Sequence, residues 1–124
     1  MTHDNANLIV SDGSEHLYYL DSATLKTVKT ISVTNNGSRL KQVNELEFVD
    51  GYIYANIWQT NMIVKINPAN GNVVGRLDLS RLNNEVRALY PQALELNGIA
   101  YDKNSKSFLV TGKFWPKAYL IKIK

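Results

Sequence analysis

The chain has 124 residues, enough for one domain, and its 44% hydrophobic and 20% charged residues are those of an ordinary globular protein. The formal net charge is only +3, and Lys and Arg are spread singly along the chain, which argues against a nucleic-acid partner. There is no cysteine, which excludes disulfides, cysteine-ligated zinc and a thiol nucleophile. Neither His3 nor His16 has a carboxylate at ligand spacing, so no metal site is predicted. No apolar run could span a bilayer and no hydrophobic leader follows Met1, so we expect no membrane span and no signal peptide on this chain.

Short β-rich runs between clusters of Gly, Asn, Asp and Pro predict an all-β fold. The predicted strands are residues 8–10, 17–20, 28–33, 46–49, 52–55, 63–66, 73–79, 98–101, 108–111 and 118–121. Only residues 1–7 are available for an innermost strand of the first group. The segment 80–94 has Leu82, Val86 and Leu89 among charged residues, so it is predicted to contain a short helix.

The strands form a repeated unit. Leu17–Leu20, Ile63–Ile66 and Ala118–Ile121 align, and their starts at 17, 63 and 118 give spacings of 46 and 55 residues. An insertion at 80–95 lengthens the second spacing. A period of about 45–50 residues with four short strands is typical of β-propeller blades. We therefore predict one propeller segment, 1–124, with blades at about 1–35, 44–79 and 96–124.

The strand count amounts to about two and a half antiparallel blades, whereas closed propellers have about four to eight. An open arc leaves unpaired sheet edges, which pair readily with another chain. We expect either that a longer protein supplies the remaining blades or that a second copy of the chain closes the ring.

The repeat also brings polar and aromatic residues to equivalent positions. Shifts of 46 and then 55 residues superimpose Asp12, Trp58 and Lys113 at the same end of the second strand of each unit. In the innermost strand, Asn44 corresponds to Asn97. These equivalences predict a site beside the central channel.

Six motifs, in this order, make the chain resemble the bacterial and plant type of glutaminyl-peptide cyclotransferase, also called glutamine cyclotransferase. They are Val10–Ser14, Leu17–Asp21, Asn44–Glu47, Tyr54–Thr60, Leu96–Asp102, and Thr111–Lys113 with Trp115–Lys117. The resemblance implies a five-bladed propeller of about twice this length. It implies conversion of the N-terminal glutamine of a peptide or protein to pyroglutamate with loss of ammonia, and a periplasmic or secreted location. This chain resembles only the C-terminal half of the family. The N-terminal half carries the glutamate proposed as proton shuttle, so we expect the chain alone to be inactive.

Glutamine cyclisation needs no nucleophilic residue, metal or cofactor, because the substrate's α-amine attacks its own side-chain amide carbon. Through the resemblance, Asn44, Trp58 and Lys113 match residues that line the family pocket. Trp58 would form an apolar wall, Lys113 would donate to the developing oxyanion, and Asn44 would orient the amine or carbonyl. The polar neighbours Asn56 and Gln59 are further candidates for substrate binding. The structural alternatives are a core tryptophan, a surface lysine and an asparagine that caps a turn.

Four further residues are secondary. Glu45 and Glu47 alternate with Asn44 and so should point to the opposite face, either as a general base or, the favoured interpretation, as structural partners of an adjoining blade. Asn97 is interpreted as structural, in a turn before Gly98. Trp115 would form a packing corner with Pro116 or part of the pocket rim. For the whole chain, the alternative function is a non-catalytic propeller segment that binds a peptide or serves as a structural module.

Overall fold

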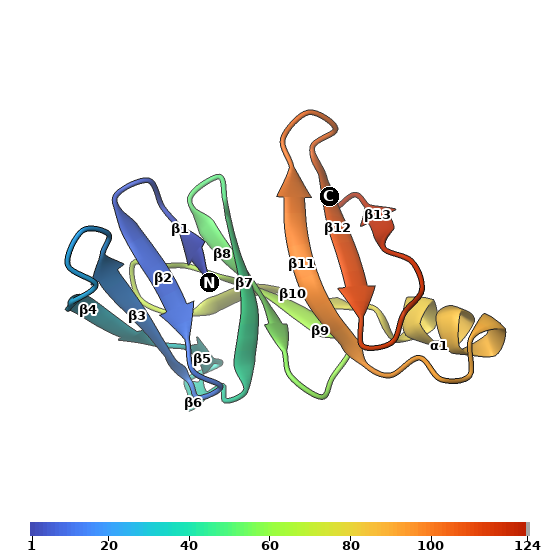
Figure 1. Ribbon diagram of the computed structural model, residues 1–124. Helices are drawn as coiled ribbons and strands as arrows, with labels where there is room; N and C mark the ends of the chain where they lie inside the picture. Colours follow the sequence, from blue (N-terminus) through green and yellow to red (C-terminus); the bar gives the residue numbers. More distant parts are fainter. Residues whose placement is uncertain (124) are drawn as a thin grey trace.

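The computed structural model describes residues 1–123 and consists mostly of antiparallel strands in separate sheets (Figure 1). The first sheet has the order β1-β2-β3-β4, formed by Thr2–His3, Asn7–Ser11, His16–Asp21 and Thr27–Ser32. The central sheet has the order β7-β8-β9-β10, formed by Val43–Val49, Tyr52–Ile57, Met62–Ile66 and Val73–Asp78. The third sheet has three strands, β11-β12-β13, formed by Leu96–Asp102, Ser107–Gly112 and Tyr119–Ile121.

The mostly β architecture and the short helix are confirmed. Every predicted strand is present, residues 1–7 supply the short β1, and α1 spans Ser80–Leu89 within the predicted segment. A hairpin of β5 (Thr34–Asn35) and β6 (Ser38–Arg39) was not predicted as strands. Its turn residues, Asn36 and Gly37, both have positive φ, at 52° and 84°, as a type I′ hairpin turn requires.

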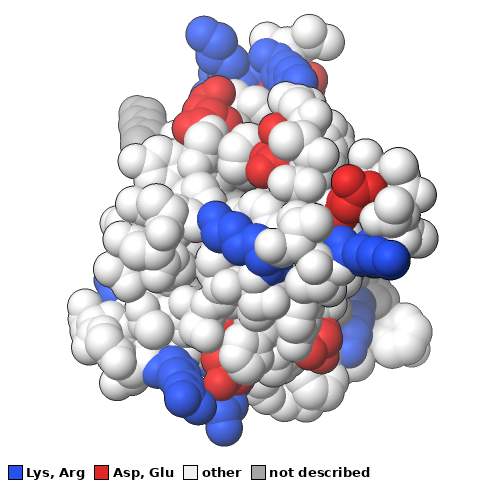
Figure 2. Space-filling model, turned by 90° about the vertical axis from the view of Figure 1, so that its left-hand side faces the viewer, with Lys and Arg blue, Asp and Glu red and all other residues white. Residues whose placement is uncertain are grey.

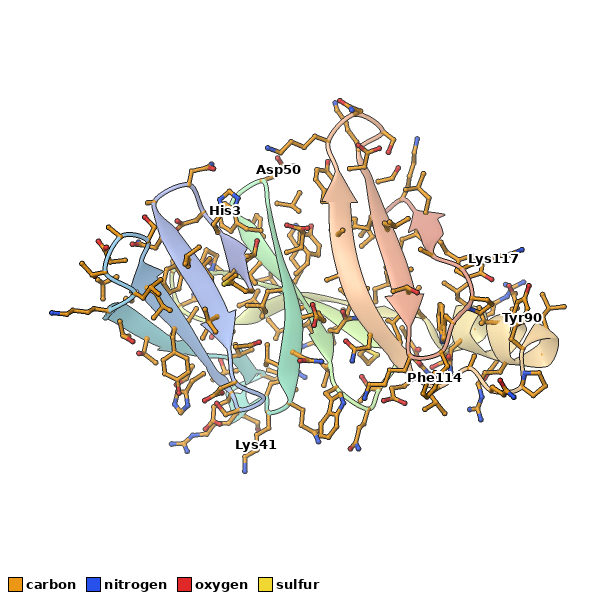
Figure 3. The ribbon with its side chains drawn as sticks, viewed as in Figure 1. His3, Lys41, Asp50, Tyr90, Phe114 and Lys117 are labelled. Carbon is orange, nitrogen blue, oxygen red and sulfur yellow. The ribbon has the colours of Figure 1, made fainter. Side chains whose placement is uncertain are left out.

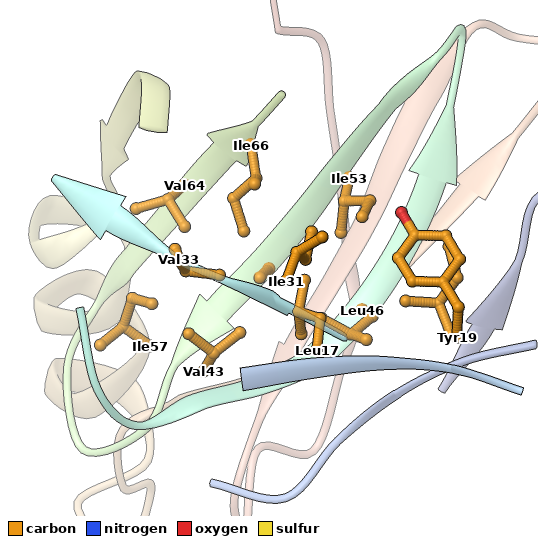
Figure 4. Packing of buried hydrophobic residues seen from close by; sticks show 12 residues of the cluster. Leu17, Tyr19, Ile31, Val33, Val43, Leu46, Ile53, Ile57, Val64 and Ile66 are labelled. Carbon is orange, nitrogen blue, oxygen red and sulfur yellow. The ribbon is translucent and has the colours of Figure 1, made fainter. Parts of the chain in front are cut away.

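Two hydrophobic layers separate the three large sheets. Between the first and central sheets, Leu17 of the first sheet and Ile53 and Ile66 of the central sheet belong to one buried cluster (Figure 4). Ile9 of the first sheet belongs to the same cluster, and all four residues have no exposed surface. Between the central and third sheets, Ile63 packs with the buried residues Val86, Leu96, Val110 and Trp115. Burying each Ile or Leu contributes about 1.5–3 kcal/mol. The central sheet is therefore covered on both faces, whereas each outer sheet has one covered face.

The inner strands are tied together by one carboxylate. Glu47 of β7 accepts a hydrogen bond from the Thr2 hydroxyl of β1 at 3.4 Å and from the Tyr101 backbone N–H of β11 at 3.1 Å. Thr2 Oγ1 in turn accepts from the Phe48 N–H at 3.1 Å. The favoured interpretation of Glu47 as a structural partner of an adjoining sheet is confirmed, because its carboxylate joins all three large sheets.

Aspartates stabilise several of the turns, and this predicts acid sensitivity. Asp21 Oδ1 accepts from the backbone N–H of Thr24 at 2.8 Å and of Ala23 at 2.9 Å, and these bonds hold the pKa of Asp21 below its ordinary value of 3.8. A depressed folded-state pKa gives stability that is complete above pH 3.8 and is lost as the pH falls further. In urea unfolding measured between pH 6 and pH 2, we expect Asp21→Asn to lose stability less steeply with acid than the parent protein.

Asp50→Asn is the matched control for this experiment. Asp50 also lies in a turn, between β7 and β8, but within residues 1–123 its carboxylate accepts no side-chain hydrogen bond. If the free energy of unfolding fell less steeply with acid in both variants, to the same extent, the hydrogen bonds of Asp21 would not be the cause.

Candidate functional site

The predicted site residues gather at one end of the sheets. Strand β8 ends at Ile57 and β12 ends at Gly112, so Trp58 and Lys113 follow equivalent strands at equivalent points. Strands β7 and β11 begin at this same end, because Val43 pairs with Ile57 and Leu96 with Gly112. In Figure 3 this is the lower end, where Lys41 and Phe114 are labelled, whereas His3 and Asp50 lie at the upper end.

Lys113 and Trp58 meet across the boundary between the central and third sheets. The Lys113 ammonium nitrogen lies 5.4 Å from the centroid of the Trp58 ring and 3.4 Å from a carboxylate oxygen of Glu95. Trp58 is 38% exposed, which is inconsistent with a core tryptophan. The cation is therefore held between an aromatic face and a carboxylate while remaining open to a ligand.

Matching hydrogen bonds hold the backbone at both residues. The Trp58 N–H donates to the Gln42 carbonyl at 2.8 Å, and the Lys113 N–H donates to the Glu95 carbonyl at 3.1 Å. Gln42 and Glu95 each lie directly before an inner strand, one residue ahead of Val43 and Leu96. Two copies of the same local structure thus present an aromatic ring and a cation to one another.

Asn44 and Asn97 also face one another. The Asn44 side-chain amide donates to the Asn97 side-chain oxygen at 3.3 Å, and both residues are half-buried. Each lies in a β-bulge, between Val43 and Leu46 in β7 and between Leu96 and Ile99 in β11. Bulges re-aim side chains and are common next to active sites. The pair retains one amide oxygen and further N–H groups for a ligand.

Comparison with known proteins decides the family. A family model described as glutamine cyclotransferase matches residues 1–123. The chain belongs to the glutamine cyclotransferase family. It is 38% identical over 122 residues to a glutaminyl-peptide cyclotransferase of Arabidopsis thaliana, covering 98% of this chain and 38% of that protein. The crystal structure of Myxococcus xanthus glutaminyl cyclase matches with a TM-score of 0.89 and 36% identity, covering 97% of this chain and 52% of the other. The chain thus spans about half, or less, of these family members.

Two predicted substrate contacts of this glutamine cyclotransferase chain lie in different environments. Gln59 is exposed in the turn that follows Trp58 and has a positive φ of 64°. Asn56 is buried between the central and third sheets, where its side-chain oxygen accepts from the Gly98 N–H at 3.1 Å. Its amide nitrogen is buried without a partner among residues 1–123. Gln59 can therefore reach a ligand at the surface, whereas Asn56 holds β11 against β8.

The secondary candidates require corrections. Asn97 is not in a turn, because it lies within β11. The bulge adds a residue to β7, so the strict alternation from which Glu45 and Glu47 were placed opposite Asn44 is interrupted between Val43 and Leu46. Glu45 is exposed. Trp115 is 9% exposed, and its ring N–H donates to the Leu94 carbonyl at 2.8 Å, so it forms a packing corner.

Glu95 was not predicted, although the repeat contained a signal for it. It corresponds to Gln42 at the same shift of 53 residues that relates Asn44 to Asn97, directly before the inner strand. Within residues 1–123, no group of three or more His, Cys, Asp or Glu side chains is placed to hold a metal ion. Over the same residues, no helix is long and apolar enough to cross a membrane.

Proposed function

We propose that this chain is part of a glutaminyl-peptide cyclotransferase, which converts the N-terminal glutamine of a peptide or protein to pyroglutamate and releases ammonia. The observation that carries this is the contact of Lys113 with Trp58 at the same end of the sheets as the Asn44–Asn97 pair, in a chain of this family. A cation, an apolar wall and amide groups meet at one solvent-accessible end of the sheets. These are the groups that a compact, uncharged glutamine side chain and its developing oxyanion require.

The chemistry follows from these groups. The substrate's neutral α-amine attacks the side-chain amide carbon, forming a C–N bond and a tetrahedral oxyanion. The Lys113 ammonium donates to that oxygen, and Glu95 keeps the ammonium in place. Trp58 covers the apolar methylenes of glutamine and excludes water, while Asn44 orients the amine. When the C–NH2 bond breaks, a proton moves from the attacking nitrogen to the leaving nitrogen, and ammonia departs.

We propose that the group that carries this proton lies outside residues 1–123. Glu95 is paired with Lys113 at 3.4 Å, and Glu47 is used in joining the sheets. We infer that the three large sheets are consecutive blades of a five-bladed propeller and that the remaining blades supply the acid–base group. The similarity to relatives of about twice the length or more supports this arrangement.

The outer sheets indicate what completes the ring. The central sheet is covered on both faces, whereas Leu109 and Leu120 of the third sheet are exposed. On the side of the first sheet, Figure 2 shows Lys and Arg interspersed with Asp and Glu among uncharged residues, without a patch of one sign. We propose that the preceding half of the protein covers these faces. A second copy of the chain is the alternative.

Light scattering separates the two partners. The chain has a mass of 14.0 kDa, so a ring closed by a second copy would have twice that mass in solution. We expect instead that the chain by itself does not form a discrete dimer. A stable species of twice the chain mass, with cyclase activity, would contradict completion by the preceding half.

The activity is tested with a glutamine-initiated peptide and mass spectrometry for loss of ammonia. We expect product from the protein extended by its preceding half and none from residues 1–124 alone. If the extended protein binds the peptide without turnover, the alternative of a non-catalytic peptide-binding module is supported.

A further inference from the structure

An exposed apolar groove lies next to the candidate site. It has a volume of about 330 Å³ and lies between the loop after α1 and the loop after β12. Its lining residues are Leu89, Tyr90, Pro91, Gln92, Phe114 and Pro116. Phe114 is 77% exposed and Leu89 is 73% exposed. Isolated exposed apolar residues are common, but large ones gathered in one hollow mark a binding surface.

The backbone at Phe114 is held in an unfavourable conformation. Its φ is 58°, in the left-handed region that bulky residues rarely adopt. The surrounding structure imposes this. The Lys113 N–H donates to the Glu95 carbonyl and the Lys113 carbonyl accepts from the Leu94 N–H, both in the loop before β11, and the Trp115 N–H donates to the Gly112 carbonyl at 3.1 Å. Such conformations cluster at functional sites. Here the turn buries Trp115 while leaving Phe114 in solvent.

One residue of the groove follows the candidate glutamine site directly in the chain. Phe114 directly follows Lys113, whose ammonium contacts Trp58. In Figure 3, Phe114 lies at the same end of the molecule as Lys41, and Tyr90 lies beside the helix at the right-hand edge. An extended peptide advances about 3.3–3.6 Å per residue. A substrate whose first residue rests against Lys113 and Trp58 can therefore place its next residues over Phe114.

We propose that this groove binds the second and third residues of the substrate and favours large apolar side chains there. The inference rests on the proposed function, since it assigns the same site a preference beyond the N-terminal glutamine. Phe114 and Leu89 would cover one apolar side chain, and Tyr90 and Pro91 would form the outer wall. None of these residues takes part in the cyclisation itself.

The test compares three substrates in the protein extended by its preceding half: glutaminamide, Gln-Phe-Leu-amide and Gln-Ser-Ser-amide. We expect kcat/KM for the apolar tripeptide to exceed that for the serine tripeptide by about 10-fold, mainly through KM, as for burial of one apolar side chain. Phe114→Ala should reduce this ratio to about 2-fold or less. Phe114→Gly, which also relieves the positive φ, should do the same and so exclude backbone strain as the cause.

Leu25→Ala is the matched control. Leu25 is 61% exposed and has a φ of 60°, but it lies in the turn between β3 and β4, at the opposite end of the first sheet. It should leave the ratio of the two kcat/KM values unchanged.

Equal kcat/KM values for both tripeptides in the parent protein, or an unchanged ratio in both Phe114 variants, would overturn the inference while leaving the proposed function intact. If glutaminamide and both peptides all fail to react, the proposed function is wrong. In that case, the affinity of Gln-Phe-Leu-amide for the parent protein and for Phe114→Ala is measured by calorimetry. Equal affinities would show that the groove does not bind the peptide.

Discussion

Lys113→Ala is expected to lower kcat for a glutamine-initiated peptide by about 10²–10³-fold, the usual effect of removing one donor to a developing oxyanion. The measurement uses the protein extended by its preceding half and a coupled assay for ammonia. The decrease in kcat should be larger than for removal of an uncharged hydrogen-bond donor. Glu95 lies 3.4 Å from the Lys113 ammonium, and without Lys113 its carboxylate would be left unpaired beside the oxyanion. KM should change less than kcat, since the oxygen is charged only in the transition state.

Two variants define the specificity of this effect. Lys117→Ala removes an exposed lysine four residues farther along, at the position labelled in Figure 3, and should leave kcat within about twofold of the parent value. Lys113→Ala with Glu95→Gln removes the unpaired carboxylate and should recover part of the loss. A decrease of less than about fivefold in Lys113→Ala would exclude Lys113 as the oxyanion donor.

The positions of Trp58 and Lys113 were predictable because they depend on the repeat alone. Strand ends are marked by turn residues, and equivalent strands end at equivalent points in a repeated unit. The shifts of 46 and 55 residues therefore located both side chains before any contact was known. Their proximity in the structure follows from packing the third sheet on the central one.

The bulges were not predictable from alternation. A bulge adds one residue without changing the polar or apolar character of its neighbours. The sequence around Asn44 and Glu45 is therefore indistinguishable from that of a regular alternating strand. One physical hint existed at the equivalent position in β11, where Gly98 has a φ of 130° that only glycine adopts easily. The same limit applies to Asn56. In a strand covered on both faces, polar residues can be buried, and their neighbours Ala55 and Ile57 do not reveal it.

Gly112→Ala is expected to destabilise the chain by about 3 kcal/mol or more, the largest effect on folding among the substitutions considered. A Cβ at Gly112 would lie 2.3 Å from two ring atoms of Trp115. The ring cannot easily move, because it is 9% exposed, packs edge-on against Tyr119 and donates to the Leu94 carbonyl at 2.8 Å. Displacing it combines overpacking of a core with loss of a buried hydrogen bond. The measurement is urea unfolding followed by tryptophan fluorescence.

Gly75→Ala is the matched control, since a Cβ there would lie 3.4 Å from the Lys65 Cβ, within ordinary contact distance. It should change the free energy of unfolding by less than about 1 kcal/mol. The cost of Gly112→Ala is also measured in a Trp115→Phe background, where the ring is smaller. We expect Gly112→Ala to destabilise the Trp115→Phe protein less than it destabilises the parent. Equal costs in the two backgrounds would show that the clash with Trp115 is not the cause. Because Gly112 directly precedes Lys113, the same substitution should also move the ammonium away from Trp58, so that folding and the proposed catalysis depend on one close contact between a glycine and a tryptophan.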